Sequence, residues 1–429
     1  MSITNSEYIY MDFYKATHND ILYHLQNLRH LVFEVTDQCN LDCRYCAYSE
    51  LYRGYDARKG KNMSFIKAKL IMDYLCDLWK GGGYSDGSNN ELTISFYGGE
   101  PLMNFRFIQQ VIDYVENLGL EKIGKICSYS MTTNAVLINQ YMDYLVEKDF
   151  RLLISLDGDE FAQSYRRDHL GNNSFDRVFK NIKLLQDKYP EYFENKISFN
   201  SVLHNRNEIE SIHQFIRTQF AKIPRISPLS EVGICKEKKH EFISIYRNPT
   251  ESFYRSGNCE FIESEMLMRT PRTAQLADYI LHQGANDYYT YNDLYINKDE
   301  LPLSTGTCVP FFKKMFVTVN GKILPCERIS QQFSVGQVHE DRVELNENYV
   351  VDRHNYYISK YANQCINCVS NRVCMQCVYF IDDICKDDTR CPSFLTKNDL
   401  ERRNEDTFKF LEEHPHYYKR ILEEVKITV

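Results

Sequence analysis

The sequence predicts an α/β protein built on a partial barrel of six strand–helix units, followed by a cysteine-rich C-terminal part. Three observations support this fold class. Short apolar runs alternate with amphipathic segments from residue 30 to residue 232. The repeat is about 30–40 residues long, which is typical of crossovers in a parallel sheet. Eleven of the fifteen cysteines gather toward the two ends of the chain, with three at 39–46 and eight at 308–391.

The expected elements follow one another in a regular order. We expect strands at 30–36, 92–99, 126–134, 150–158, 196–204 and 225–232. We expect amphipathic helices at 64–80, 105–118, 138–149, 175–189 and 208–220. Six units suit a partial (β/α)6 barrel better than a closed eight-fold barrel. In such sheets the chemistry gathers at the C-terminal ends of the strands.

The same patterns divide the chain into five parts. Residues 1–29 form an N-terminal extension, and 30–232 form the partial barrel. An irregular polar segment at 233–300 bridges to a cysteine-rich domain at 301–396. Residues 397–429 are expected to form a C-terminal helix.

Composition narrows the functional class. The 51 basic and 59 acidic residues give a net charge of −8, which disfavours a nucleic-acid partner. The first residues lack a basic start, and no apolar run reaches the roughly 18 residues of a membrane span. We therefore expect a cytoplasmic protein without a membrane partner. Because the cytosol keeps thiols reduced, the fifteen cysteines favour metal binding over disulfides.

Polar residues follow four of the expected strands. The sequence "TDQC" follows the first strand, and "YGGEP" (97–101) follows the second. The third strand ends in "TTN" (132–134) and the fourth in "SLDG" (155–158). One rim of the barrel is therefore expected to carry three thiols, a Gly-Gly-Glu turn, an amide and a carboxylate.

The first cysteine group has the spacing C-x3-C-x2-C, formed by Cys39, Cys43 and Cys46. Thiolates are soft ligands that select iron–sulfur clusters or zinc. A structural zinc site usually takes four ligands, whereas three cysteines on a four-iron cluster leave one iron open. An open coordination position is where metal chemistry takes place.

This motif, with Tyr45 before its last cysteine, resembles that of the radical S-adenosylmethionine (SAM) enzymes. The resemblance implies that SAM binds the open iron of a [4Fe–4S] cluster and is cleaved to a radical that abstracts a substrate hydrogen. Two glycines permit close backbone approach, and a glutamate can accept from the SAM ammonium. The residues that the resemblance assigns to SAM binding are Tyr45, Gly98, Gly99, Glu100, Asn134, Ser155 and Arg167, with Arg166 as the alternative arginine.

The C-terminal cysteines resemble the SPASM extension of that family, which holds two auxiliary four-iron clusters. The family usually shows C-x3-C where this chain has C-x2-C at Cys374–Cys377. By motif position the outer cluster takes Cys365, Cys368, Cys374 and Cys391, and the inner one takes Cys308, Cys326 and Cys377, with Cys385 or an open site in fourth place. The resemblance therefore implies three [4Fe–4S] clusters and SAM as cofactors. Two zinc-ribbon sites are the alternative for these eight residues.

Glu327 directly follows Cys326. In the related anaerobic sulfatase maturases a carboxylate at the matching position acts as a base, so the resemblance implies a catalytic base here. The alternative is a surface ion pair with Arg328 or Lys322.

The resemblance favours a maturase of ribosomally made precursor peptides that installs a thioether or carbon–carbon cross-link. Such an enzyme needs a reducing partner such as flavodoxin or ferredoxin. About 30 residues precede the first strand, which is short for a leader-binding module, so 233–300 or a separate protein is expected to recognise the leader. The alternatives are a sulfatase maturase forming formylglycine, a tRNA-modifying radical SAM enzyme and a non-catalytic zinc-binding interaction protein.

Overall fold

The computed structural model describes residues 14–81, 91–266, 276, 280, 305–370, 374, 376–386 and 389–424. The chain divides into two compact units. The barrel unit comprises His18–Pro271 and Val309–Val350, and the C-terminal unit comprises Met1–Thr17, Arg272–Cys308 and Val351–Val429. Within the described part of the chain, no helix has the length and apolar character needed to span a bilayer.

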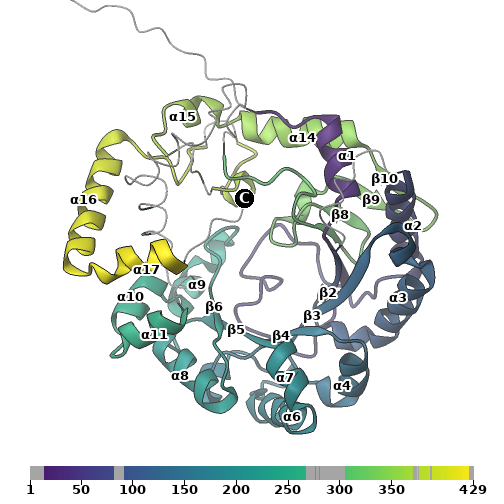
Figure 1. Cartoon of the computed structure of the whole chain (residues 1–429), viewed down its shortest axis with the longest axis horizontal. Helices are drawn as coiled ribbons and strands as arrows, with labels where there is room; N and C mark the ends of the chain where they lie inside the picture. The colour runs from purple at the N-terminus through teal and green to yellow at the C-terminus, as the bar shows by residue number, and fades with distance from the viewer. Residues whose placement is uncertain are drawn as a thin grey trace, which may run out of the picture. The chain divides into compact units, whose positions relative to one another are not determined.

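The described strands of the barrel unit form one ten-stranded sheet, ordered β10-β9-β8-β7-β1-β2-β3-β4-β5-β6 (Figure 1). Strands β1 to β6 are parallel neighbours, and β7 also runs parallel to β1. The bounds of the parallel strands are β1 His30–Thr36, β2 Glu91–Gly98, β3 Ile126–Thr133, β4 Arg151–Ser155, β5 Ile197–Leu203, β6 Arg225–Pro228 and β7 Met315–Val317. The antiparallel strands are β8 Lys322–Leu324, β9 Gly336–Val338 and β10 Val343–Leu345.

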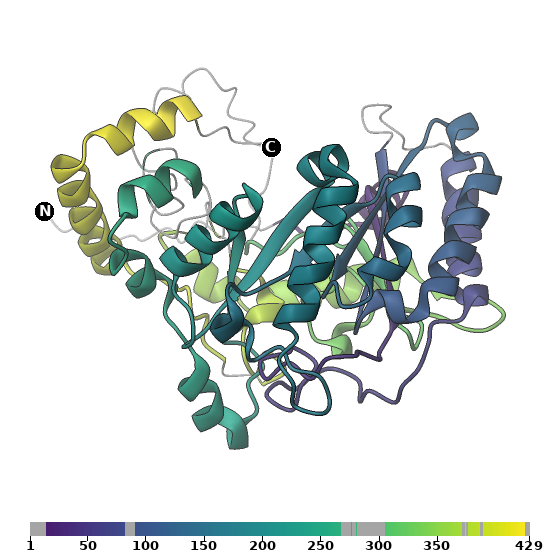
Figure 2. The same ribbon diagram turned by 90° about the horizontal axis from the view of Figure 1, so that it is seen from below.

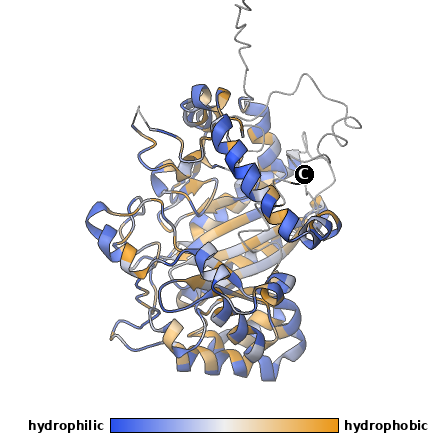
Figure 3. Ribbon diagram, turned by 90° about the vertical axis from the view of Figure 1, so that its left-hand side faces the viewer, coloured by the Kyte–Doolittle hydropathy of each residue, from blue (hydrophilic) through white to orange (hydrophobic). Residues whose placement is uncertain are grey.

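Amphipathic helices cover the outer face of the sheet, as Figures 1 and 2 show. Their bounds are α2 Phe65–Gly81, α3 Phe105–Leu118, α4 Ile138–Glu147, α6 Phe175–Lys188 and α8 Ile209–Phe220. Helix α3 buries Phe107, Ile108, Val111, Ile112 and Val115, a spacing that forms one stripe along a helix. Figure 3 shows the same division, with strands largely orange to white and helices that carry both colours.

Strand β1 is buried along almost its whole length. Leu31, Phe33 and Val35 are fully buried, and the Phe33 ring meets that of Phe107 on α3 edge to face at 6.1 Å between centroids. Alternate residues lie on the other side of the strand, where Glu34 accepts a hydrogen bond from the Val319 amide at 2.9 Å. The strand that begins the cysteine loop is therefore anchored on both faces.

The six strands and five helices expected between residues 30 and 232 are all present, so the fold class is confirmed. The chain differs from expectation after residue 308, because residues 309–350 continue the barrel sheet instead of belonging to a separate cysteine-rich domain. Strands β7 to β10 have three residues each, too short for an alternating pattern to be visible.

The expected bridging and terminal segments are also more structured than their sequence indicates. Within 233–300 the chain forms α9 Lys239–Ile245, α10 Pro249–Tyr254 and α11 Cys259–Met266, and residues 267–300 lie outside the described residues except Leu276 and Ile280. The expected C-terminal helix is two helices, α16 Lys397–Glu413 and α17 His416–Glu424. Pro415 stands between them, and proline cannot donate the hydrogen bond that would continue a helix.

The barrel unit and the C-terminal unit each have further helices. In the expected N-terminal extension, α1 His18–Gln26 packs on the barrel, and the Trp79 indole of α2 donates to the Leu25 carbonyl at 3.1 Å. The other helices include α14 Glu347–Ser359 and α15 Ala362–Ile366. A small apolar cluster of the C-terminal unit joins Leu276, Ile280, Tyr417 and Ile421.

Candidate functional site

The loop that follows β1 carries the first three cysteines and borders a pocket of about 930 Å³. Cys39, Cys43 and Cys46 all line this pocket, and each is partly exposed. The structure thus brings together the three thiols that the spacing selects. The pocket is also lined by Arg58 and Arg167.

Backbone contacts hold both ends of the cysteine loop. At its start, the Asp37 carboxylate accepts from the Lys59 and Lys61 amides at 2.9 and 2.6 Å. Further along, the Asp42 amide donates to the Arg167 carbonyl at 2.7 Å, and the Arg44 amide donates to the Tyr165 carbonyl at 3.1 Å. The loop is therefore tied to segments more than a hundred residues away in the sequence.

The Gly-Gly turn after β2 presses directly against the start of the cysteine loop. The Gly99 amide donates to the Thr36 carbonyl at 2.9 Å, and the Glu100 amide donates to the Gln38 carbonyl at 2.8 Å. A Cβ on Gly99 would lie 1.8 Å from the Gln38 oxygen, and one on Gly98 (φ +126°) would lie 2.4 Å from the Thr36 oxygen. The two glycines are required because the backbone of the cysteine loop occupies that space.

Glu100 is 1% exposed and its carboxylate is already hydrogen-bonded within the chain. It accepts from the Asn134 amide at 2.7 Å, from the Thr133 hydroxyl at 2.8 Å and from the Leu102 amide at 3.2 Å. Burial raises the pKa of Glu100 to about 7, against the lowering effect of these donors. Its expected contact with SAM stays a prediction, because it is not among the residues that line the pocket.

Asn134 and Ser155 end neighbouring strands and are both buried. The Asn134 amide nitrogen Nδ2 donates to Asn40 Oδ1 at 2.7 Å and to the sulfur of Cys39 at 3.7 Å. Ser155 is the last residue of β4 and is 9% exposed. The structure therefore brings Asn134 against the cysteine loop, whereas Ser155 is not part of the pocket lining.

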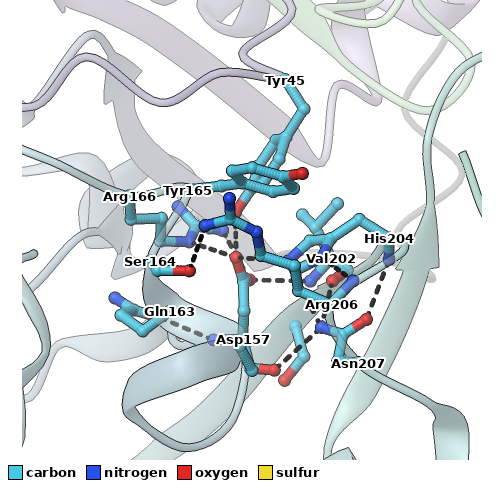
Figure 4. A network of polar contacts seen from close by, with 12 residues as sticks. Tyr45, Asp157, Gln163, Ser164, Tyr165, Arg166, Val202, His204, Arg206 and Asn207 are labelled. Atoms are coloured by element: carbon cyan, nitrogen blue, oxygen red, sulfur yellow. Dashed lines mark hydrogen bonds and ion pairs between the residues drawn. The ribbon is translucent and has the colours of Figure 1, made fainter. Parts of the chain in front are cut away.

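Tyr45 is not among the residues that line the pocket and joins a buried polar network, shown in Figure 4. Its hydroxyl donates to Asp157, which also accepts from Arg166 Nε and Nη2 at 3.0 and 3.1 Å and from the Val202 amide at 2.9 Å. The Tyr45 ring stacks on His204, with centroids 5.5 Å apart. Because Tyr45 lies between Cys43 and Cys46 in the sequence, this network fixes the position of the thiols. The assignment of Tyr45 to SAM binding stays a prediction.

The two neighbouring arginines, Arg166 and Arg167, have different surroundings. Arg166 is 7% exposed and pairs with Asp157, which is fully buried. Burial opposes ionisation of Asp157, but Arg166 and His204 overcome it and lower its pKa to about 2. Arg167 instead lines the pocket, with Nη2 at 3.6 Å from the Asp42 carboxylate. Of the two arginines, Arg167 is therefore the one placed to meet a ligand.

The groups around the three thiols fit an anionic iron–sulfur group. Cys39 Sγ accepts from the Leu41 amide at 3.5 Å, and Cys46 Sγ accepts from Arg58 Nη2 at 3.9 Å. Burial raises the pKa of Cys39 to about 11 in the absence of a metal. Two buried nitrogens of the pocket lining, Asn40 Nδ2 and Arg58 Nε, have no hydrogen-bond partner within the described residues. Unpaired donors beside thiols are expected where an electron-rich group binds.

A second, smaller pocket lies in the C-terminal unit. Four cysteines border this cavity of about 20 Å³: Cys365, Cys368, Cys374 and Cys391. This is the set that motif position assigns to the outer cluster. The Cys391 amide donates to Gln364 Oε1 at 2.9 Å and the Leu395 amide donates to the Cys368 sulfur at 3.5 Å, which fixes two of the four thiols.

The cysteines assigned to the inner cluster belong to different units. Cys326 lies in the barrel unit, and Cys308, Cys377 and Cys385 lie in the C-terminal unit. Burial raises the pKa of Cys377, with a smaller contribution from Cys308 nearby. Cys385 is exposed. Their assignment to one cluster stays a prediction.

Glu327 forms an ion pair with a lysine other than the one expected. Lys314 Nζ donates to Glu327 Oε1 at 2.9 Å, while Lys322 pairs with Asp56 at 2.6 Å. The Cys326 thiol donates to Glu327 Oε2 at 3.7 Å. Burial opposes ionisation of Glu327, but Lys314 holds its pKa below the usual value. The sequence did not point to Lys314 as the partner, because this residue lies thirteen positions before Glu327, directly before strand β7.

No three histidine, cysteine or acidic side chains of the described residues are arranged to hold a single metal ion. The sequence placed the carboxylate of "SLDG" (155–158) on this rim, but it did not point to Arg58 or His169 as neighbours of the cysteine loop. His169 Nε2 lies 2.8 Å from the Cys39 carbonyl oxygen. The sequence signals for these residues are weak, since each belongs to an ordinary polar loop.

Comparison with known proteins identifies the barrel. Residues 33–218 match the model of the radical SAM superfamily. This part of the chain is a radical SAM domain, which confirms the resemblance seen in the cysteine motif.

Two relatives show the range of that similarity. The radical SAM cyclopropyl synthase TigE of Paramaledivibacter caminithermalis is 26% identical over 80% of this chain and 66% of its own length. A cysteine-type anaerobic sulfatase-maturating enzyme of Clostridium novyi is 27% identical over 48% of this chain and 54% of its own length. The chain thus spans between half and two thirds of these two relatives.

A solved structure shares the fold over almost the whole chain. The native anSMEcpe structure with bound AdoMet superposes with a TM-score of 0.60 at 18% identity, covering 93% of this chain and 100% of that one. A further structure of the same protein, with AdoMet and the Cp18Cys peptide, gives a TM-score of 0.58 at 17% identity. At this level of identity the match establishes the α/β fold.

Proposed function

We propose that this protein is a radical SAM maturase that acts on a ribosomally made precursor peptide and installs a thioether or carbon–carbon cross-link. The observation that carries the proposal is the convergence of Cys39, Cys43 and Cys46 on one pocket of about 930 Å³. That volume lies at the upper end of the range for small-molecule sites, so it accommodates a cofactor together with part of a substrate. The related cyclopropyl synthase and sulfatase-maturating enzyme support a modifying role.

The cofactors follow from the same arrangement. A [4Fe–4S] cluster held by the three thiols, together with SAM, supplies the radical chemistry that removes a hydrogen atom from the substrate. Arg167 at the pocket binds a carboxylate, and the Gly-Gly turn keeps the cysteine loop in position. We further propose two auxiliary clusters, the outer one on the four thiols of the second pocket.

Glu327 is our candidate for the group that accepts the substrate proton. Its carboxylate lies next to Cys326 and is held by Lys314 at 2.9 Å, which restricts it to one orientation. The inner auxiliary cluster, on Cys308, Cys326 and Cys377 with Cys385 as a possible fourth ligand, would then take up the remaining electron. A flavodoxin or ferredoxin is the proposed reducing partner, and the segment 233–300 or a separate protein the proposed leader-binding element.

The test is to co-express the protein with small open reading frames that neighbour its gene and to weigh the peptides. The expected result is a peptide that has lost two hydrogen atoms and does not react with a reagent that labels aldehydes. A Cys46→Ala variant, which removes one thiol of the first pocket, is the matched control and should leave the peptide unmodified. If every neighbouring peptide keeps its mass, a different substrate class is indicated.

A second candidate function is a sulfatase maturase that forms formylglycine. It is supported by the sequence similarity to the cysteine-type anaerobic sulfatase-maturating enzyme of Clostridium novyi. The same experiment distinguishes the two functions, because formylglycine reacts with a hydrazide reagent and a cross-link does not. A non-catalytic zinc protein is distinguished at the purification step. A zinc protein purified anaerobically is colourless, whereas a protein with three clusters is brown and contains about twelve irons per chain.

A further inference from the structure

Arg58 occupies an unusual position beside the three thiols. It lies on the loop between β1 and α2 and lines the same pocket as Cys39, Cys43 and Cys46. Its Nη2 donates to the Cys46 sulfur at 3.9 Å, and its guanidinium carbon lies 4.3 Å from the centroid of the Tyr48 ring. The residue is therefore held by an aromatic face on one side and directed at a thiol on the other.

The positive charge of Arg58 reaches the buried carboxylate of Glu34 without forming an ion pair with it. Its Nε is buried without a hydrogen-bond partner, and no acidic side chain of the described residues forms an ion pair with it. A guanidinium in this state has donors and charge available for an anionic group in the pocket.

We propose that Arg58 is a positioning residue that sets the reduction potential of the cluster bound by Cys39, Cys43 and Cys46. The inference rests on the proposed function, because it presupposes that cluster. Hydrogen bonds to the ligand sulfurs and nearby positive charge stabilise the electron-rich reduced form. Loss of the guanidinium makes the cluster harder to reduce, and Tyr48 contributes by keeping the guanidinium plane in place.

The test compares the full-length reconstituted wild type with Arg58→Met, Arg58→Lys and a matched control, Lys59→Met. Lys59 has the same charge one residue away, is exposed, and its side chain has no contact with a thiol among the described residues. The midpoint potential is measured by dithionite titration with electron paramagnetic resonance detection. The signal of this cluster is recognised because it changes when SAM is added.

We expect Arg58→Met to shift the reduction equilibrium tenfold toward the oxidised form, which is 59 mV for a one-electron couple. Arg58→Lys keeps the charge but loses the planar donor fork, so a smaller shift in the same direction is expected. Lys59→Met should retain the wild-type potential. A SAM-responsive signal with equal potentials in the wild type and Arg58→Met would overturn the inference and leave the proposed function standing.

Two further outcomes are separable. If the wild type gives no SAM-responsive signal, the proposed function fails and the inference with it. If Arg58→Met binds no iron, Arg58→Lys and Tyr48→Leu decide, because both keep a positive charge at the loop while changing its placement. Wild-type potentials in both of these variants would then refute the role of Arg58.

Discussion

The buried pair Asp157–Arg166 allows a prediction that depends on neither cofactor nor substrate. Asp157 is fully buried and its carboxylate accepts from the Arg166 guanidinium at 3.0 and 3.1 Å and from the Val202 amide at 2.9 Å. Asp157→Asn leaves the buried guanidinium without its counter-charge. Breaking one partner of a buried ion pair costs about 3–5 kcal/mol, so we expect a loss of that order in the stability of the barrel unit.

The pKa of Asp157 gives a second value for the free energy that its ionised form contributes to folding. It falls from 3.8 to about 2 in the folded chain, which corresponds to about 2 kcal/mol of stabilisation. Because the folded pKa is the lower one, this contribution is complete above pH 4 and is lost as the pH falls through 2. The difference between wild type and Asp157→Asn should therefore be constant from pH 7 to 4 and shrink below it.

The assay is urea unfolding followed by tryptophan fluorescence. The chain has one tryptophan, Trp79, which is buried in α2 of the barrel unit, so the signal reports on that unit. The matched control is Asp143→Asn, which removes an exposed carboxylate from its pair with Lys188 and should shift the midpoint little. Equal midpoints for the two variants would refute the idea that the network holds the cysteine loop.

Three further predictions address the turn, the buried glutamate and the second pocket. Gly99→Ala places a Cβ 1.8 Å from the Gln38 oxygen and should prevent the three thiols from holding iron. The control is Gly81→Ala, whose Cβ has nothing within 4 Å and which should leave the iron content unchanged. Equal iron content in the two variants would contradict the close approach of the backbone at Gly99. Because the folded pKa of Glu100 is about 7 against 4.5, the wild type should lose stability as the pH rises from 4.5 to 7, by about 3 kcal/mol at most. Glu100→Gln, measured by the same tryptophan assay, should abolish that slope, and an unchanged slope would assign it to another group. Cys374→Ser should lower the iron content from about twelve to about eight per chain while the SAM-responsive signal is retained, and loss of that signal would argue against separate clusters.

The sequence patterns were sufficient for the parts of the fold that depend on local periodicity. The apolar run at 30–36 is β1, and the stripe at 105–118 is α3, with the same bounds. The resemblance to the SPASM extension also selected the four cysteines that border the second pocket. In these cases the pattern that determines the structure lies in residues close together in the sequence, so it can be recognised there.

The remaining features depend on contacts between distant residues. Tyr45 meets Asp157, 112 residues away, and no local pattern records that pairing. Arg166 and Arg167 are identical in type and adjacent, yet one is buried in an ion pair and the other lines the pocket. Arg58 belongs to no motif. Only the fold decides which polar residue of a loop faces the thiols.

The pairing of β1 with β7 has a consequence for synthesis of the chain. Leu31 lies opposite Met315, so 315 − 31 = 284 residues separate the two partners. At ribosomal rates of about 5–20 residues per second, one edge of β1 remains unpaired for roughly 15–60 s, until β7 has been synthesised. During that interval a strand with three fully buried apolar side chains presents unpaired backbone groups, which other chains could join. The strand that leads to the cysteine loop is therefore the one whose protection is completed late in translation.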